Sequence, residues 1–308
     1  MGIRPSPSVV GRPPPGDLAL IAVAVVAVST AAPLIREADA PSLAVAFWRN
    51  ALAVAVLAPV TALRRRAEVA ALVPAQRRGT ILAGVFLAAH FATWVPSLSF
   101  TTVASSVALV ATQPVWAALM ARARGEQVPA RAWAGIALAV TGAGVLSGVD
   151  LSISARALLG DALALAGGVL AAAYVTVGSE VRQTVSTTVY TTVCYAVAAS
   201  ALAVMCLAGG QDLSGYDAGT WVTLAALTAG PQLLGHSIVN RVLRTTSATV
   251  VSVAILFEIV GSSFLAWVAF GEAPPTGAYP AAVLIAAGVV LVVLSGRQPA
   301  VSGAPVLE

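Results

Sequence analysis

Long apolar stretches separated by short polar ones run through the whole sequence. Ten of them are long enough to be membrane-spanning helices, since a span needs about 20 residues at 1.5 Å rise each. The predicted spans are residues 18–33, 43–63, 79–97, 103–123, 131–146, 158–177, 187–207, 220–240, 248–270 and 278–295. They lack the alternation of polar and apolar residues that is typical of barrel strands. The pattern therefore predicts an all-α integral membrane protein with ten transmembrane helices.

The second half of the sequence repeats the first. Residues 90–129 recur at 236–275, so that His90, one of only two histidines, falls on His236. The starts of the halves also match, because Gly16-Asp17 resembles Gly160-Asp161. A long match at one offset indicates duplication. Five spans per copy is an odd number, so the second repeat would enter the membrane upside down, an arrangement common in secondary transporters.

These patterns divide the chain into four parts. They are a cytoplasmic tail (1–16), a first repeat (17–148), a second repeat (158–296) and a cytoplasmic tail (297–308). A cleaved signal peptide is the competing interpretation of the first apolar run. It is disfavoured because the residues around Asp17 recur around Asp161, where no signal peptidase would act.

Composition and charge agree with a protein dissolved in lipid. The chain is 58% hydrophobic and 10% charged, against about 25% charged in a soluble domain. Its net charge of +4 does not indicate nucleic-acid binding, because the basic residues form no single patch. Most arginines fall on one side of the predicted topology, and only Arg36, Arg49 and Arg156 fall on the other. The positive-inside rule then predicts that both termini are cytoplasmic, and the Ala-, Val- and Arg-rich usage favours a bacterial plasma membrane.

A known family shares this repeated pattern. The motifs are SFTTVASSVALVATQPVWAALMARARGE and LLGHSIVNRVLRTTSATVVSVAILFEIVGSSFLAWVAFGE, each ending in Gly-Glu before a last helix that contains glycine. They resemble the EamA domains of the drug/metabolite transporter superfamily, and the resemblance covers about residues 17–296. It implies ten helices, a central cavity between the halves, and export or exchange of small metabolites such as amino acids, related polar compounds or drugs.

The chain departs from that family at one position. Many members carry proline in both copies of the fourth helix, whereas this chain has Pro114 in the first copy and Phe257-Glu258 in the second. A proline kink is therefore expected to be missing from the ninth helix, which would make the gating of the two halves unequal.

Polar residues at membrane depth are the candidates for a substrate cavity, because such residues are costly in lipid and usually face an interior. His90 and His236 would line the cavity and bind substrate or relay protons, or else each would bond a neighbouring helix. Glu258 would hold a proton, a cation or a substrate amine, or else be a neutral or paired structural carboxyl. Gln113, beside Pro114, would bind substrate or a neighbouring helix.

Aromatic residues complete the predicted cavity. Trp94 and Tyr174 would stack on the apolar part of a substrate, although aromatic residues near helix ends more often anchor the membrane interface. Arg49 is predicted near the outer end of the second span, where it would snorkel, pair with an acidic group, or attract anionic substrates. Gly125-Glu126 and Gly271-Glu272 are interpreted as helix ends.

The sequence predicts a secondary transporter that needs no cofactor. It contains no HExxH or CxxC motif and no glycine-rich phosphate loop. A membrane-embedded enzyme is therefore the weakest alternative, and a scaffold or sensor that does not transport is the other. The expected partners are a small-molecule substrate and the lipid bilayer. Gly135, Ala139 and Ala143 lie four residues apart on the fifth span, where small residues allow close helix contact, either within the chain or in a homodimer.

Overall fold

All regular structure in the described residues is helical. The structure is a computed structural model, and it describes residues 13–101, 103–146, 154–271 and 278–295. In chain order the helices are α1 (Pro15–Ser29), α2 (Ala31–Glu37), α3 (Ser42–Arg64), α4 (Arg66–Ala70), α5 (Pro74–Ser97), α6 (Val103–Val110), α7 (Gln113–Ala123), α8 (Ala130–Leu146), α9 (Ala155–Val181), α10 (Thr187–Ala208), α11 (Ala218–Leu227), the π-helix η1 (Thr228–His236), α12 (Ser237–Val242), α13 (Ala248–Ile255), α14 (Phe257–Phe270) and α15 (Ala278–Leu294).

Each predicted span coincides with one helix or with consecutive helices. Within the described residues, seven helical stretches are long and apolar enough to cross a membrane: Pro15–Glu37, Ser42–Arg64, Pro74–Ser97, Ala155–Val181, Thr187–Ala208, Ala218–Val242 and Ala248–Ala269. The other three predicted spans coincide with α6 and α7 together, with α8, and with α15, whose continuous helices are shorter. The structure thus supports a multi-pass membrane protein, and ten crossings stay a prediction.

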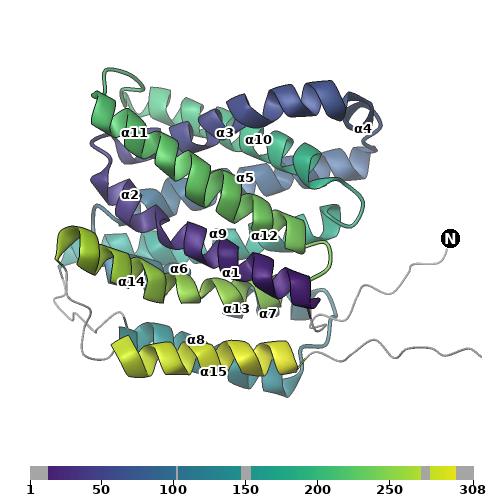
Figure 1. Ribbon diagram of the computed structural model, residues 1–308, viewed down its shortest axis with the longest axis vertical. Coiled ribbons are helices and arrows are strands. Elements are labelled where there is room, and N and C mark those ends of the chain that lie inside the picture. The colour runs from purple at the N-terminus through teal and green to yellow at the C-terminus, as the bar shows by residue number, and fades with distance from the viewer. Residues whose placement is uncertain (1–12, 102, 147–153, 272–277, 296–308) are drawn as a thin grey trace, which may run out of the picture.

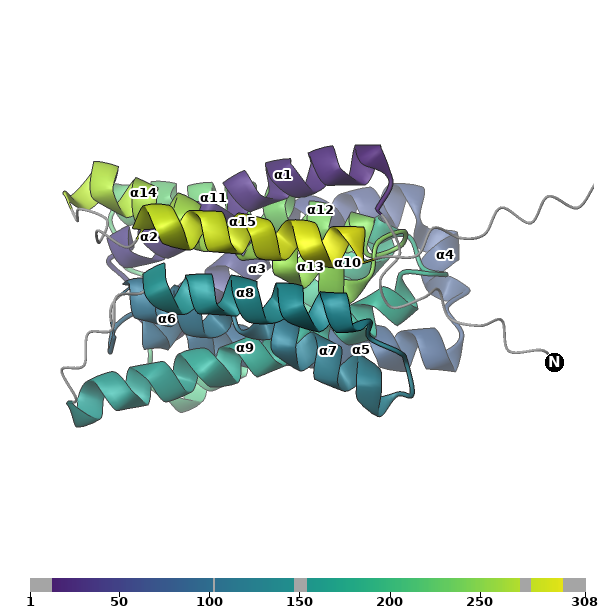
Figure 2. The same ribbon diagram turned by 90° about the horizontal axis from the view of Figure 1, so that it is seen from below.

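The long helices lie side by side along one common direction (Figure 1, Figure 2). In Figure 1, α1 begins at the right-hand side and α15 ends at that same side. The helix α9, which opens the second half, begins at the opposite side and runs antiparallel to α1. The two halves therefore run in opposite directions, as an odd number of segments per half requires.

The halves are joined by an exchange of their first helices. The helix α9 of the second half packs against α5, α6 and α7 of the first, and α1 of the first half packs against η1, α12, α13 and α14 of the second. The second, fourth and fifth segments of the two halves also meet, in the pairs α3 with α10, α7 with α13, and α8 with α15. Contacts between the halves therefore follow the repeat that the sequence shows.

The repeated aspartates hold these exchanged helices at opposite ends of the bundle. The Asp17 carboxylate accepts hydrogen bonds from the hydroxyls of Thr245 and Thr246, which follow the third segment of the second half. The Asp161 carboxylate accepts one from Thr101, which follows the third segment of the first half, at 2.9 Å. The matched Gly-Asp pairs are thus explained by equivalent contacts.

The fourth span of each half breaks at the same level. Between α6 and α7, the amide of Thr112 donates to Leu109 O at 3.1 Å, and between α13 and α14 the amide of Leu256 donates to Val253 O at 3.1 Å. These i to i−3 bonds are a tight turn that interrupts the α-helix. The ninth segment has no proline at this position, as the sequence shows, and it is nevertheless interrupted at Leu256. In the first half, Pro114 lies directly after the corresponding turn.

Gly125 and Gly271 are the glycines of the two predicted Gly-Glu turns. Each ends its helix in the left-handed conformation, with φ of 81° at Gly125 and 67° at Gly271. Glycine adopts this region without steric cost, which is why it ends helices. Glu126 forms an ion pair with Arg124 at 2.7 Å on the surface, and Glu272 lies outside the described residues. The interpretation of these glycines as helix ends agrees with the structure.

The backbones of α8 and α15 approach one another closely at their glycines. A Cβ atom at Gly288 would lie 2.5 Å from Gly135 O and 2.6 Å from the Ala139 Cβ. The small residues of the fifth span are therefore used for packing within the chain. Nothing in this contact requires a second copy, and the homodimer stays a prediction.

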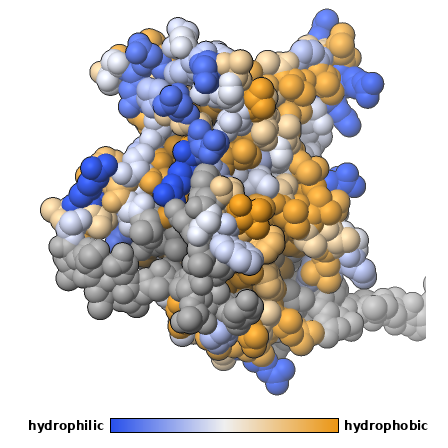
Figure 3. Space-filling view, turned by 60° about the vertical axis from the view of Figure 1, so that its left-hand side comes forward, coloured by the Kyte–Doolittle hydropathy of each residue, from blue (hydrophilic) through white to orange (hydrophobic). Residues whose placement is uncertain are grey.

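Large apolar side chains cover much of the outer surface. Figure 3 shows a broad hydrophobic area between groups of hydrophilic residues at its margins. Valine and leucine on several helices are exposed there and elsewhere on the bundle, among them Val26, Leu63, Val204, Leu207, Val222 and Val268. Exposed apolar area on this scale is unfavourable in water and favourable in lipid, which agrees with an embedded bundle.

Candidate functional site

A buried arginine lies at the centre of the bundle. Arg49 of α3 is fully buried, and its Nε donates to Gln232 Oε1 at 2.8 Å. The Gln232 amide donates in turn to Asn50 Oδ1 at 3.0 Å, and Asn50 donates to Ala46 O. The prediction that Arg49 snorkels from the outer end of its span is wrong, because its side chain turns inward and is held there by a second buried polar residue.

The π-helix η1 supplies that second residue. Pro231 lies inside η1 and removes one backbone donor, so that a regular α-helix is not maintained through this turn. Gln232 follows Pro231 directly and is fully buried. Its backbone carbonyl oxygen accepts a 3.4 Å hydrogen bond from the Tyr195 hydroxyl. Single π-turns often occur at functional sites, and this one directs a glutamine at Arg49.

Phe91 of α5 is the aromatic residue around which the charged and ring side chains gather. The Arg49 guanidinium carbon lies 4.2 Å from its ring centroid. The rings of His90 and His236 have centroids 4.9 Å and 5.7 Å from the same ring. The two histidines of the repeat thus converge on one buried side chain, from α5 of the first half and from η1 of the second.

His90 has one structural partner and one stacking partner. Its Nδ1 lies 2.9 Å from the carbonyl oxygen of Gly167 in α9. Since a carbonyl only accepts, Nδ1 must carry the proton, which leaves Nε2 as an acceptor in the neutral ring. The ring stacks on Trp94 at 5.6 Å. The Nδ1 bond agrees with the helix-bonding interpretation, while a role of His90 toward a substrate stays a prediction.

Three of the predicted residues line one narrow cavity. Trp94, Gln113 and Glu258 surround a space of about 20 Å³ together with Ser252 and neighbouring apolar residues, which is room for a single water molecule. Gln113 donates to the Ser252 hydroxyl at 2.9 Å, from α7 to α13. Trp94 is buried, and its Nε1 has no hydrogen-bond partner. The structure therefore brings these residues together at the two helix breaks.

Glu258 faces this cavity from the second residue of α14, just after the break at Leu256. Glu258 and Arg49 form no ion pair within 4 Å, although both lie in the described part of the chain. The site therefore contains a cation and a carboxyl group that are not paired with one another.

Tyr174 lies apart from this cavity. Its hydroxyl donates to Asn240 Oδ1 at 2.7 Å, which joins α9 to α12. Its neighbour in this region is Arg182, whose Nε donates to Asn240 O at 2.8 Å. The structure thus satisfies the Tyr174 hydroxyl with a helix-helix bond, while its role toward a substrate stays a prediction.

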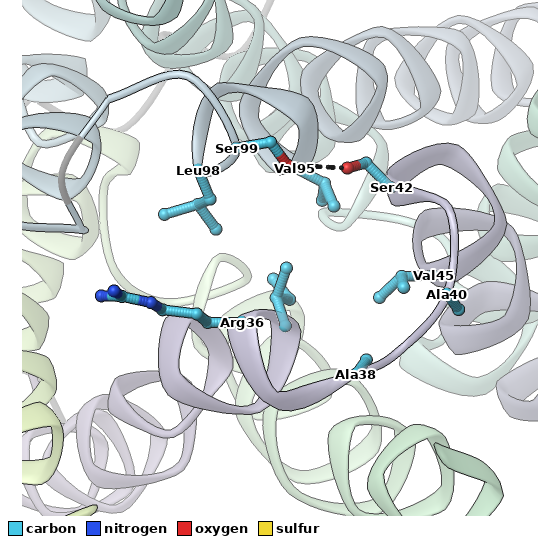
Figure 4. A pocket seen from close by; sticks show the side chains of 9 residues that line it. Arg36, Ala38, Ala40, Ser42, Val45, Val95, Leu98 and Ser99 are labelled. Atoms are coloured by element: carbon cyan, nitrogen blue, oxygen red, sulfur yellow. Dashed lines mark hydrogen bonds between the residues drawn. The ribbon is translucent and has the colours of Figure 1, made fainter. Parts of the chain in front are cut away.

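A larger pocket opens at the end of the bundle where α2 ends and α3 begins. It has a volume of about 240 Å³ and is lined by Ile35, Arg36, Ala38, Ala40, Ser42, Val45, Val95, Leu98 and Ser99. Figure 4 shows the 3.2 Å hydrogen bond between Ser42 and Ser99 across the pocket from Arg36. Arg156 donates to Ser99 O at 3.0 Å beside it. We call this pocket the vestibule.

The described residues contain no cluster of three or more side chains that would hold a metal ion. The polar groups at the centre are instead a guanidinium, amides, hydroxyls, two imidazoles and one carboxyl group. Groups of this kind bind small polar solutes by hydrogen bonds and charge. Here they come from both halves of the chain.

Comparison with known proteins decides the family. The sequence pattern of the EamA-like transporter family matches residues 15–148 and again residues 158–294. The chain belongs to the EamA-like transporter family. A solved crystal structure of a protein is 18% identical to it with a TM-score of 0.74, over 92% of this chain and 99% of that one. That likeness shows a shared fold alone. No curated protein matches the chain.

Membership of the EamA-like family confirms the resemblance that the two motifs carry, and it gives the repeat a common origin in a membrane protein family. It does not identify the residues that bind a substrate. Sequence reasoning missed the network of Arg49, Asn50 and Gln232 in this EamA-like chain. Two signals pointed to it: Arg49-Asn50 interrupts an otherwise apolar helix, and Pro231-Gln232 interrupts another.

Loss of the Gln232 amide should destabilise the protein. We expect Gln232→Leu to lower the free energy of unfolding by about 1–3 kcal/mol, because it removes the acceptor of the Arg49 Nε and the donor to Asn50. The measurement is the apparent melting temperature in detergent. Gln183→Leu is the matched control, since the Gln183 side chain is exposed and forms only 3.3 Å bonds. Equal melting temperatures for both variants would contradict the prediction.

Proposed function

We propose that this protein is a secondary transporter that exports or exchanges small polar metabolites, amino acids or related compounds, by alternating access. The supporting observation is the buried polar cluster at the junction of the two inverted halves. Arg49 and Phe91 come from the first half, and Gln232, His236 and Glu258 from the second. A site built equally from both halves changes its exposure when one half rocks against the other.

The narrowness of the central cavity fits a closed state of such a cycle. A solute larger than one water molecule would need the helix breaks at α6/α7 and α13/α14 to open before it could enter. The vestibule gives access from one end only as far as a layer of buried apolar side chains, Ile35, Val45 and Val95. These residues are the proposed gate at that end.

Counterflow in proteoliposomes tests the transport function. Vesicles are loaded with a mixture of unlabelled amino acids, nucleosides and sugars, and the uptake of trace labelled solutes is followed. Protein-dependent accumulation of an unchanged labelled solute supports a carrier. A chemically altered solute would instead indicate an enzyme. No accumulation of any solute would favour the scaffold or sensor.

The proposed orientation places both termini in the cytoplasm of a bacterial cell and the vestibule outside. Ala75 at the start of α5 and Ser214 between α10 and α11 are both exposed and lie at opposite ends of the bundle. We expect Ser214→Cys, but not Ala75→Cys, to react with an impermeant thiol reagent in intact cells. The native Cys194 and Cys206 are buried, so the parent chain is the control. The reverse labelling pattern would overturn the orientation.

A further inference from the structure

Arg49 has two nitrogen atoms to offer a ligand. Both its Nη1 and its Nη2 are buried and have no hydrogen-bond partner, while its Nε is bound to Gln232. We propose that Arg49 is the carboxylate-binding residue of the solute site and that its two free nitrogens bind the two oxygens of the carboxylate. The assignment rests on the transport function proposed above and names the substrate class as small monocarboxylates, zwitterions included.

The guanidinium is held ready for such a ligand. Gln232 fixes its Nε edge at 2.8 Å, and Asn50 fixes Gln232. The ring of Phe91 covers one face at 4.2 Å. With one edge and one face occupied, the fork of Nη1 and Nη2 keeps a single orientation, and a planar fork of this kind matches a carboxylate through two parallel hydrogen bonds. A preorganised donor loses little side-chain freedom on binding.

Burial strengthens the hydrogen bonds that the unpaired Nη1 and Nη2 atoms can form with a ligand. A buried cation without partners is unfavourable, so a ligand that satisfies both nitrogens is bound more strongly than it would be in water. Within the described residues, Glu258 forms no ion pair with Arg49, and so it leaves the fork unoccupied. A planar carboxylate offers two oxygens to the fork, and its single negative charge balances the single positive charge of the guanidinium.

The vestibule leads toward this fork. Val45 and Arg49 are four residues apart on α3, and Val95 and Phe91 are four residues apart on α5, so each pair lies on one face of its helix. The valines line the vestibule, and Arg49 and Phe91 lie one turn deeper. Arg36 lines the vestibule and Arg156 lies beside it, while the neighbouring Glu37 and Asp39 are exposed and do not line it.

Efflux from proteoliposomes tests the assignment. Vesicles are loaded with an equimolar mixture of the common amino acids, small hydroxy acids, nucleosides and neutral sugars, and the released solutes are measured by mass spectrometry. We expect protein-dependent release to be confined to solutes with a carboxylate. Arg49→Gln should slow it by at least about tenfold, because hydrogen bonds to charged groups are lost. Arg49→Lys should also be slowed, since it keeps the charge but not the fork.

Two controls separate binding from folding. Arg182→Gln removes another buried arginine, whose Nε and Nη2 are bound to Asn240 and Thr187, and it should keep the preference for carboxylates. In wild-type protein, the free acid of the fastest solute should inhibit its counterflow at least about tenfold better than the matching carboxamide. This second measurement needs no variant, so it decides the question even where Arg49→Gln does not fold.

The outcomes distinguish the two proposals. Release of nucleosides or sugars at the rate of carboxylates, equal inhibition by acid and amide, or wild-type release by folded Arg49→Gln would each overturn the carboxylate assignment and leave the transport function standing. Release of no solute above protein-free vesicles would contradict the transport function itself, and the assignment would fall with it.

Discussion

Gly288→Val should disrupt the packing of α15 against α8 and lower the yield of folded protein severely. The first added carbon alone would lie 2.5 Å from Gly135 O, 2.6 Å from the Ala139 Cβ and 2.7 Å from the Ala139 amide nitrogen. Two of these three atoms belong to the backbone of α8, so no side-chain rotation relieves the overlap. The helices would have to separate along the contact, and we expect a loss of about 3 kcal/mol or more in the free energy of unfolding.

The same helix pair supplies the control. A Cβ at Gly144 of α8 would meet no atom of another element within 4 Å in the described part of the chain. We therefore expect Gly144→Val to carry the ordinary cost of valine in a helix. Monodispersity on size-exclusion chromatography and the apparent melting temperature in detergent report the difference. If Gly288→Val resembled Gly144→Val in both measurements, the close approach of α8 and α15 would be wrong.

The helices were predictable from sequence because lipid imposes a simple rule on a chain. Backbone groups in hydrocarbon must bond within their own segment, so a long apolar run such as residues 43–63 has few alternatives to a helix. The structure places α3 at Ser42–Arg64, one residue beyond that run at each end. The repeat was equally visible, since Asp17 and Asp161 mark equivalent starts. These features depend on neighbouring residues and on spacing, which the sequence contains.

The interior of the site was less predictable, because it depends on which face of each helix turns inward. Arg49 lies in the first third of α3, a position compatible with snorkelling, and only the packing of Phe91 and Gln232 against it shows that it points to the centre. No proline in the sequence marks the position of the break at Leu256. The depth of Tyr174 in its predicted span places it at the level of the cavity but does not show which way its side chain points. In the structure its hydroxyl donates to Asn240.

Glu258→Gln should abolish solute accumulation driven by a pH gradient while exchange at equal pH continues. Glu258 lines the central cavity at the break that opens in the proposed cycle. Glutamine keeps the shape and much of the hydrogen bonding of the side chain but cannot exchange a proton. A carrier whose coupling resides at this carboxyl group would therefore become uncoupled and still move its solute down a concentration gradient.

Amino acids would connect this role with that of Arg49. A zwitterion that places its carboxylate on the Arg49 fork could turn its ammonium group toward Glu258, where it would replace the proton. One proton would then cross in exchange for one solute, because the same carboxyl group binds either but not both. Competition of this kind is the simplest basis for antiport. It requires that Arg49 and Glu258 form no ion pair with one another in the closed state, and none is present within 4 Å among the described residues.

Gradient-driven accumulation and equal-pH exchange of the same labelled amino acid, measured in one preparation of proteoliposomes, separate the roles of Glu258. Glu126→Gln serves as the control, because Glu126 pairs with Arg124 outside the cavity. A carboxyl group introduced by Gln113→Glu would not replace that of Glu258, because Gln113 lies on α7 of the other half. Unchanged accumulation by Glu258→Gln would exclude a coupling role. Loss of exchange together with accumulation would instead indicate that solute binding itself requires the Glu258 carboxylate.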